Sequence, residues 1–348
     1  MSEQSLAVKY RPQTFDEVVE QGSIKLILTQ QLKSGQIKNA YLFCGGAGTG
    51  KTTCARLFAN AINEGIGTPI EIDAASNNSV NDVRNIIQQA RMASLDGSKY
   101  RVWIIDECHS LSNSAWQAML KLLEEPPATA IFIFCTTDPQ KIPKTILSRV
   151  QRYDFQRISQ KGIVKRLHYI CNEECICPVM TDITSPYGQA LEYIAKIADG
   201  GMRDAITLLD KCLAYSTDLT LENVVAAVGA VDYDVMLHLS DSLIYADAKN
   251  MIDDIESLHA QGKDLKLFVK SFTTFILDLC KYFVVGTLDY TQIPNYYKQT
   301  LDAKQDGYYH SCEQLLKLLL KLNSDIKWDT NPKAMIEASL YQFCVKGE

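Results

Sequence analysis

One stretch of this sequence has the residue types and spacing to hold phosphate groups: Gly45-Gly46-Ala47-Gly48-Thr49-Gly50-Lys51-Thr52. It fits G-x-x-x-x-G-K-[ST] at every position, and its glycines let the backbone curl so that N–H groups point at phosphate oxygens. The Lys51 ammonium can neutralise the outer phosphates of a nucleoside triphosphate, and the Thr52 hydroxyl is placed for Mg²⁺. A chance glycine-rich turn is the alternative, but the stretch lies between an apolar run and a helical pattern, as a phosphate loop requires. We therefore predict a nucleotide site at Gly45–Thr52 and the adjacent Thr53.

A pair of carboxylates, Asp106-Glu107, ends a second apolar run, Val102–Ile105. An aspartate at the carboxyl end of a buried strand can hold Mg²⁺ through water, and the glutamate beside it can act as general base on the attacking water. An Asp-Glu pair on a loop is commonly just solvated, but its place downstream of a phosphate loop favours the catalytic role. The two motifs together predict a P-loop ATPase with ATP and Mg²⁺ as cofactors.

A third polar edge, Thr136-Thr137-Asp138-Pro139, follows the apolar run Ala130–Cys135. A hydroxyl at this position could sense the γ-phosphate or position water. Thr-Asp-Pro is also good turn chemistry, so a turn cap explains the same residues. The spacing alone does not decide between the two.

The elements that must position these motifs alternate between strand and helix along the first half of the chain. Strands that are apolar on both faces and alternate with helices predict an α/β domain, in which helices cover a parallel sheet. The predicted strands are Ala40–Cys44, Pro69–Ile72, Val102–Ile105 and Ala130–Cys135, and the predicted helices are Lys51–Asn63, Ser79–Met92 and Ala115–Leu123.

Strand patterns stop after about residue 157, and the rest of the chain is predicted to be helical. We expect an α/β ATPase domain over 1–158, a small all-helical domain over 159–228 and an all-α domain over 229–348. The last helices either pack on one another or form an oligomer interface, and their pattern fits both. The predicted helices are Ile163–Cys175, Tyr187–Ala198, Met202–Ala214, Leu221–Val228, Tyr233–Tyr245, Ala246–Ala260, Asp264–Val285, Ser311–Leu322 and Pro332–Cys344.

The composition of the 348 residues, 47% hydrophobic and 22% charged, is ordinary for a soluble globular protein. The formal net charge of −6 argues against a protein built mainly to coat nucleic acid. It divides into +2 over residues 1–158 and −8 over 159–348, so we expect the two parts to face different partners. No apolar run is long enough to span a membrane and the start of the chain has no secretory pattern, so we expect a cytoplasmic protein.

The 11 cysteines are odd in number and scattered, which favours reduced, buried thiols over a disulfide framework. Only Cys171, Cys175 and Cys177 lie close together in sequence. Their C-x3-C-x-C spacing is not a common zinc pattern, and no second cysteine or histidine pair follows nearby. A metal site there is disfavoured.

Several further stretches resemble the ATPase subunit family of the bacterial clamp loader, DNA polymerase III subunit gamma/tau. The similarity is dense over about residues 10–215 and weak afterwards. The Leu-Glu-Glu-Pro-Pro and Thr-Thr-Asp-Pro-Gln-Lys stretches favour this family over the eukaryotic and archaeal loader subunits. The stretches are Tyr10–Phe15 with Val18, Val19 and Gln21; Glu71–Ser76; Leu122–Pro127; Thr136–Pro143 running into Ile146–Arg149; and Gly201–Ala205.

The resemblance implies an AAA+ ATPase domain, a helical lid domain and a helical C-terminal collar. It implies that Thr137 is the sensor-1 residue, that Arg149 reaches into a neighbouring subunit's ATP site as an arginine finger, and that Arg203 contacts phosphate from the lid as sensor 2. A guanidinium stabilises charge that develops on the γ-phosphoryl group, and a finger supplied in trans makes hydrolysis depend on assembly. From the residues alone, either arginine would be a surface salt-bridge former. The residues implied on the adenine side of the nucleotide are Tyr10, Arg11, Pro12, Val18 and Val19.

The sequence departs from the family pattern in three places. A short loop, Asn63–Thr68, stands where the family has a zinc-binding cysteine cluster, so zinc is not carried over. Val150 replaces the cysteine of the family's Ser-Arg-Cys motif, which leaves the finger arginine in place but changes its packing. The long tail of the tau form is absent, so tau's contacts with helicase and polymerase are not expected.

The implied function is an ATP-hydrolysing motor subunit that opens a sliding clamp and loads it onto primer–template DNA during replication. The expected partners are the clamp, the DNA, and other copies or other loader subunits bound through the C-terminal helices. The helix starts near Asn77–Ser79 and Ser112–Asn113 could donate N–H groups to DNA phosphates, although capping is the commoner role.

Two other functions compete with this one. A non-hydrolysing subunit of the same machine is disfavoured by the intact Lys51, Thr52, Asp106 and Glu107. A non-clamp AAA+ ATPase of DNA recombination or repair, or a protein remodeller, would call for a winged helix or pore-loop aromatics. The acidic helical C-terminal region looks like neither.

Overall fold

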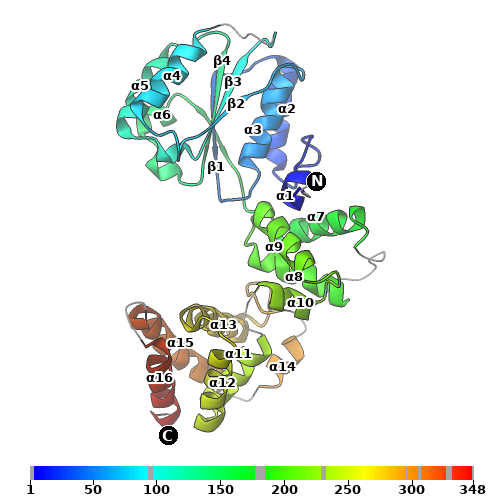
Figure 1. The fold of residues 1–348 in the computed structure, drawn as a ribbon, viewed down its shortest axis with the longest axis vertical. Helices are drawn as coiled ribbons and strands as arrows, with labels where there is room; N and C mark the ends of the chain where they lie inside the picture. Colours follow the sequence, from blue (N-terminus) through cyan, green and yellow to red (C-terminus); the bar gives the residue numbers. More distant parts are fainter. Residues whose placement is uncertain are drawn as a thin grey trace. The chain divides into compact units, whose positions relative to one another are not determined.

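The computed structural model describes residues 4–92, 97–176, 185–228, 233–294, 297–304, 307–326 and 331–346. The chain divides into two compact units, of which the first comprises Met1–Val179 with Ile194–Asp210 and the second comprises Met180–Tyr193 with Lys211–Glu348 (Figure 1). The division into three domains, 1–158, 159–228 and 229–348, stays a prediction.

The first unit is built on a five-stranded sheet with the order β2-β3-β4-β1-β5, and all neighbouring strands run parallel. This confirms the predicted α/β fold with a parallel sheet. The strand β5 was not predicted, because only Tyr153 of its four residues is buried and it forms an edge of the sheet. The strands are β1 (Ala40–Cys44), β2 (Ile70–Asp73), β3 (Arg101–Asp106), β4 (Ala130–Thr136) and β5 (Gln151–Asp154).

Helices cover both faces of this sheet (Figure 1). α2 (Gly22–Ser34) and α3 (Lys51–Ile62) pack on the face to which Tyr41 and Phe43 of β1 point. α4 (Val80–Ala90), α5 (Asn113–Glu124) and α6 (Lys144–Leu147) pack on the face to which Leu42 points. Because successive side chains of a strand point to opposite faces, an unbroken apolar strand such as β1 is buried on both sides.

The remaining helices of the first unit precede the sheet in sequence, connect its strands or follow it. α1 (Leu6–Lys9) lies near the start of the chain, η1 (Cys108–Ser110) follows β3, and η2 (Pro139–Lys141) follows β4. α7 (Gln160–Glu173) belongs to the first unit, whereas α8 (Pro186–Ile197) and α9 (Met202–Tyr215) contribute residues to both units. The carboxyl ends of β1, β3 and β4 lie at one edge of the sheet, where polar residues gather.

The second unit is all helical in its described residues. α13 (Leu265–Val285) packs against α15 (Tyr308–Asp325). A partly buried polar cluster adds to this packing, in which the Asp241 carboxylate accepts from Lys304 Nζ at 2.6 Å and from Tyr308 Oη at 2.7 Å. Burial and this contact raise the pKa of Tyr308. The helices are α10 (Leu221–Val228), α11 (Tyr233–Ile244), α12 (Ala248–Ala260), α13 (Leu265–Val285), α14 (Lys298–Asp302), α15 (Tyr308–Asp325) and α16 (Pro332–Lys346).

In the part of the chain that the structure describes, every helix is too short or too polar to cross a bilayer.

Candidate functional site

The loop between β1 and α3 has the backbone of a phosphate loop. Gly45 has φ +148° and Gly48 has φ +67°, values that residues with a side chain rarely adopt. A Cβ at Gly45 would lie 2.5 Å from the Phe155 carbonyl oxygen, so only glycine fits there. The Gly48 carbonyl accepts from the Met202 N–H at 3.0 Å, which ties the loop to the start of α9.

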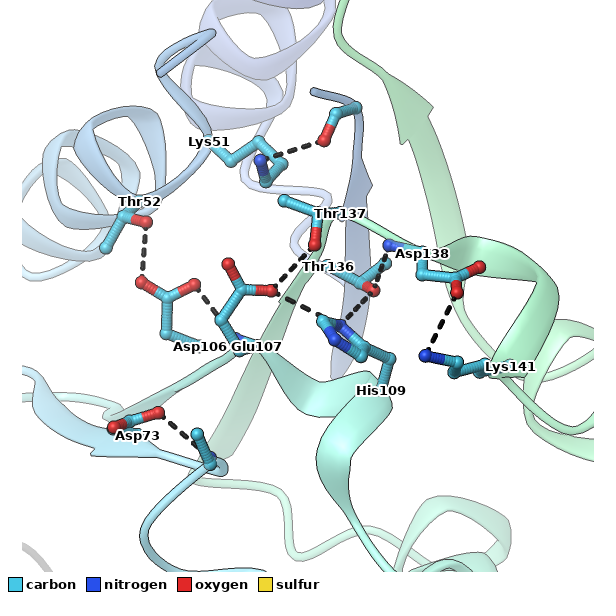
Figure 2. Close-up of polar contacts among 12 residues, drawn as sticks. Lys51, Thr52, Asp73, Asp106, Glu107, His109, Thr136, Thr137, Asp138 and Lys141 are labelled. Atoms are coloured by element: carbon cyan, nitrogen blue, oxygen red, sulfur yellow. Dashed lines mark hydrogen bonds and ion pairs between the residues drawn. The ribbon is translucent and has the colours of Figure 1, made fainter. Parts of the chain in front are cut away.

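Lys51 is the first residue of α3, and its side chain is almost completely buried, with 6% exposed. Its ammonium donates to the carbonyl oxygens of Gly45 at 2.9 Å and Gly46 at 2.7 Å (Figure 2). Burial lowers the pKa of Lys51, since desolvation disfavours the charged amine. A buried cation held by neutral carbonyls at a helix N-terminus fits the phosphate groups of ATP.

Thr52 and Asp106 form the oxygen pair that the sequence predicts for Mg²⁺. The Thr52 hydroxyl donates to Asp106 Oδ2 at 2.7 Å, and the Glu107 N–H donates to Asp106 Oδ1 at 3.0 Å (Figure 2). Mg²⁺ is bound in proteins by one or two such oxygens together with waters and substrate phosphates. The donor set therefore fits this ion, which these two residues would hold.

Glu107 lies at the end of β3 with φ +44°, a left-handed conformation that is uncommon for a residue with a side chain. Its Oε2 accepts from the Thr137 hydroxyl at 3.0 Å and lies 3.2 Å from Nδ1 of His109 (Figure 2). The carboxylate is 39% exposed, so water can reach it. This geometry suits a general base.

The two threonines at the end of β4 have different partners. Thr136, not Thr137, makes the turn, because its hydroxyl accepts from the Asp138 N–H at 3.0 Å. Asp138 in turn accepts from the Gln140 N–H at 3.2 Å and so caps η2. Thr137 is left to contact Glu107, and its sensor role stays a prediction.

A cavity of about 300 Å³ joins the phosphate loop to the segment predicted on the adenine side. Arg203, at the start of α9, also lines it, and its guanidinium has no hydrogen bond or ion pair to the described residues. Gly45 and Gly46 do not line the cavity but accept from Lys51. The predicted site residues that line it are Tyr10, Arg11, Pro12, Val18, Val19, Ala47, Gly48, Thr49, Gly50, Lys51, Thr52, Thr53, Asp106, Glu107 and Arg203.

Arg149 does not line this cavity. Its guanidinium donates to Glu124 Oε1 at 2.8 Å and to the Thr145 carbonyl at 2.7 Å. Val150, beside it, packs against the core on the α4–α5 face of the sheet. Within one chain the predicted finger arginine is thus held by its own α5.

The structure adds contacts that the sequence analysis missed. Tyr10 donates its phenolic proton to Glu174, which also pairs with Lys9 at 2.6 Å, and Arg166 donates to the Tyr10 carbonyl at 2.9 Å. More than 150 residues separate these partners in sequence, and no local pattern signals them. His109, by contrast, lies only two residues after Glu107 in the sequence, so the neighbours of the carboxylate pair could have indicated it.

The remaining candidate sites have structural explanations or lie outside the described residues. Ser79 forms a capping box with Asp82, and the Ser112 hydroxyl accepts from the Ala115 N–H at 3.2 Å, which confirms capping at both helix starts. Cys171 is buried and Cys175 exposed, while Cys177 lies outside the described residues. No group of three metal-ligating side chains occurs among the residues that the structure describes.

The parallel sheet, the phosphate loop and the paired carboxylates define the class as an AAA+ P-loop ATPase fold. The solved structure of the RuvB Holliday junction branch migration motor of Thermotoga maritima is similar, with a TM-score of 0.51 and 19% identity, over 67% of this chain and 79% of that one. A likeness at this level of identity shows the fold alone.

Family models match consecutive parts of the chain. Residues 68–159 match "DNA polymerase III, delta subunit", 162–218 match "DNA polymerase III clamp loader subunit, ATPase lid domain", and 219–346 match "DNA polymerase III subunits gamma and tau domain III". The chain belongs to the DNA polymerase III clamp-loader subunit family, of the gamma/tau type, as its resemblance predicted.

Curated relatives agree with these models. The chain is 34% identical to DNA polymerase III subunit tau of Bacillus subtilis over an alignment of 370 residues, gaps included, which covers 99% of this chain and 64% of that protein. It is 37% identical to DNA polymerase III subunit tau of Escherichia coli over 284 residues, covering 75% of this chain and 43% of that protein. The chain thus spans less than two thirds of the length of these relatives.

Proposed function

We propose that this protein is an ATP-hydrolysing motor subunit of a DNA sliding-clamp loader, which opens the clamp and loads it onto primer–template DNA during replication. The observation that carries the proposal is the convergence of Lys51, the Thr52–Asp106 pair and Glu107 on one cavity. Membership of the gamma/tau family supports the clamp as the object of the reaction.

The roles of the residues follow from their contacts. The loop N–H groups and Lys51 bind the phosphates, and Tyr10, Val18 and Val19 enclose the base side of the cavity. Bound Mg²⁺ would supply positive charge to the β- and γ-phosphates. In this proposal Glu107 accepts a proton from the attacking water, and Arg203 contacts phosphate bound to its own chain.

Assembly completes the site in this proposal. Arg149 of one subunit leaves Glu124 and contacts the γ-phosphate in a neighbouring subunit's site, so that hydrolysis requires a neighbour. The neighbours are other copies or other loader subunits, held through the C-terminal helices. ATP then acts by favouring the assembly geometry that binds an open clamp and DNA, in the cytoplasm.

The second candidate, a non-clamp AAA+ ATPase of recombination or repair, has the likeness to RuvB in its favour. That likeness concerns the fold, whereas residues 162–346 match lid and C-terminal models of clamp-loader subunits. A non-hydrolysing loader subunit would not need the Thr52–Asp106 pair or a positioned Glu107. We therefore favour the motor subunit.

The test is the steady-state ATPase rate, measured with and without a sliding clamp and primed DNA, alone and with loader partners. We expect clamp and DNA together to stimulate the rate, and Glu107→Gln to lower it about 10²–10⁴-fold while nucleotide affinity is kept. Glu125→Gln is the matched control, because this exposed carboxylate makes no hydrogen bond or ion pair to the described part of the chain. A rate that depends on Glu107 but ignores clamp and primed DNA would favour the second candidate.

A further inference from the structure

His109 has no role in the predicted site, yet it contacts the proposed general base directly. We propose that His109 is a positioning residue for Glu107: its ring holds Oε2 of the carboxylate, so that Oε1 is the oxygen that accepts the proton from water. This inference rests on the proposed ATPase function and deepens it.

The two carboxylate oxygens of Glu107 differ in their contacts. Oε2 accepts from Thr137 at 3.0 Å and lies 3.2 Å from His109 Nδ1. Oε1 has no hydrogen bond or ion pair to the described residues, and Figure 2 shows it on the side of the carboxylate that faces away from His109. Two contacts on one oxygen fix the carboxylate's orientation without occupying the other oxygen.

The His109 ring is itself anchored to the sheet. Its Nδ1 lies 3.1 Å from the hydroxyl of Thr136, a fully buried residue at the end of β4 (Figure 2). The Thr136 hydroxyl is fixed in turn by the Asp138 N–H. Two consecutive threonines therefore hold Glu107: Thr137, just after β4, directly, and Thr136, the last residue of β4, through His109.

The turn that carries His109 is equally constrained. Glu107 immediately precedes η1 and its carbonyl accepts from the Ser110 N–H at 2.9 Å, while Cys108 between them is fully buried. Only 18% of the His109 side chain is exposed, so the ring has little freedom to leave. Nδ1 faces both the Thr136 hydroxyl, at 3.1 Å, and Glu107 Oε2, at 3.2 Å. A carboxylate only accepts hydrogen bonds, so in this proposal Nδ1 is the ring nitrogen that carries the hydrogen.

The test compares two substitutions of nearly equal shape. His109→Asn keeps an N–H donor close to the position of Nδ1, and His109→Leu fills similar space without a donor. We expect His109→Leu to lower kcat about 10-fold or more, and His109→Asn to stay within about 3-fold of the unsubstituted protein. The Kd for a fluorescent ATP analogue should stay within about 2-fold in both.

A second measurement shows whether His109 acts through Glu107. In the Glu107→Gln background, His109→Leu should lower kcat no further, because the group that it positions is already lost. Independent effects of the two substitutions would overturn the proposal. So would equal losses in His109→Asn and His109→Leu, which would indicate a purely structural role, or full activity of His109→Leu.

The design separates this inference from the proposed function. If Glu107→Gln turns over ATP as fast as the unsubstituted protein, the proposed function fails. If Glu107→Gln is inactive and His109→Leu is fully active, this inference alone fails. If thermal unfolding shows that His109→Leu does not fold, His109→Ala replaces it as the variant that lacks an N–H donor.

Discussion

At the scale of single residues, Lys51 shows most directly how binding function conflicts with stability. The folded chain buries its ammonium, which among the described residues donates to the carbonyls of Gly45 and Gly46. Burial lowers the pKa of Lys51, so the charged form is less favourable in the folded than in the unfolded chain. This loss of folding stability is present at neutral pH. It disappears as the pH rises first through the pKa of Lys51 in the folded chain and then through its pKa in the unfolded chain.

We predict that Lys51→Met raises the stability of the nucleotide-free protein by about 1 kcal/mol while abolishing ATP binding. Thermal unfolding without nucleotide and titration with a fluorescent ATP analogue measure the two effects. Lys33→Met, at an exposed lysine in the last turn of α2, is the control and should change neither. A lysine-to-methionine variant at position 51 that unfolds at a lower temperature would contradict the argument.

A second residue-scale prediction concerns the loop glycines. Gly45→Ala introduces a Cβ 2.5 Å from the Phe155 carbonyl at a φ of +148°, so the loop must move. We expect it to cost about 2 kcal/mol or more and to weaken nucleotide binding. Gly35→Ala is the matched control, since its φ is also positive at +68° but its Cβ meets nothing within 4 Å. The control should cost only about 1 kcal/mol, and equal losses in the two variants would show that the clash does not matter.

At the scale of elements, α7 positions the segment predicted on the adenine side. Lys9 and Tyr10 bind Glu174, and Arg166 binds the Tyr10 carbonyl. The hydrogen bonds from Lys9 and then from Tyr10 hold the pKa of Glu174 below its usual range. These hydrogen bonds therefore stabilise the folded chain fully when the pH is above the ordinary pKa of a carboxyl group. The stabilisation is lost as the pH falls through the lowered pKa of Glu174.

We predict that Glu174→Gln weakens ATP binding several-fold and leaves kcat at saturating ATP unchanged, because only the base side of the cavity loosens. The difference in thermal stability between this variant and the unsubstituted protein should shrink as the solution is acidified through the lowered pKa. Glu173→Gln, one residue earlier on the exposed surface of α7, is the control. A fall in kcat without a change in Kd would be inconsistent with this role.

The elements also show what sequence can predict. β1 was predicted at its observed bounds because all five of its residues are apolar and buried. β5 was missed because Arg152 and Asp154 interrupt its apolar pattern at the sheet edge. The contiguous motifs predicted most of the residues that line the cavity, but not Arg166, which also lines it. Arg166 and Glu174 could not be found, because only the folded chain brings them to Tyr10.

At the scale of the whole molecule, the contacts of Arg149 bear on how one subunit could act on the nucleotide site of another. In the single chain it pairs with Glu124, so a finger role in trans requires that a neighbour's site offer a stronger partner. Phosphate charge is such a partner, because a guanidinium binds it through two parallel hydrogen bonds. The exposed pair with Glu124 contributes little by itself.

We predict that Arg149→Ala lowers the ATPase rate stimulated by clamp and DNA about 10²-fold or more, while the isolated chain binds ATP normally. Mixing this variant with Lys51→Ala subunits should restore part of the rate, because one supplies the site and the other the finger. Glu124→Gln is the control and should not slow the stimulated rate. No recovery on mixing, with assembly intact, would refute the action in trans.

The hydrogen bond from the Met202 N–H to the Gly48 carbonyl makes one backbone amide a reporter of the phosphate loop. A ligand that tightens the loop should slow deuterium uptake at Met202 more than at amides further along α9. The same bond works in the opposite direction. We expect any binding event that strains the start of α9 to weaken phosphate binding by an equal free energy, because coupling between two binding events is reciprocal.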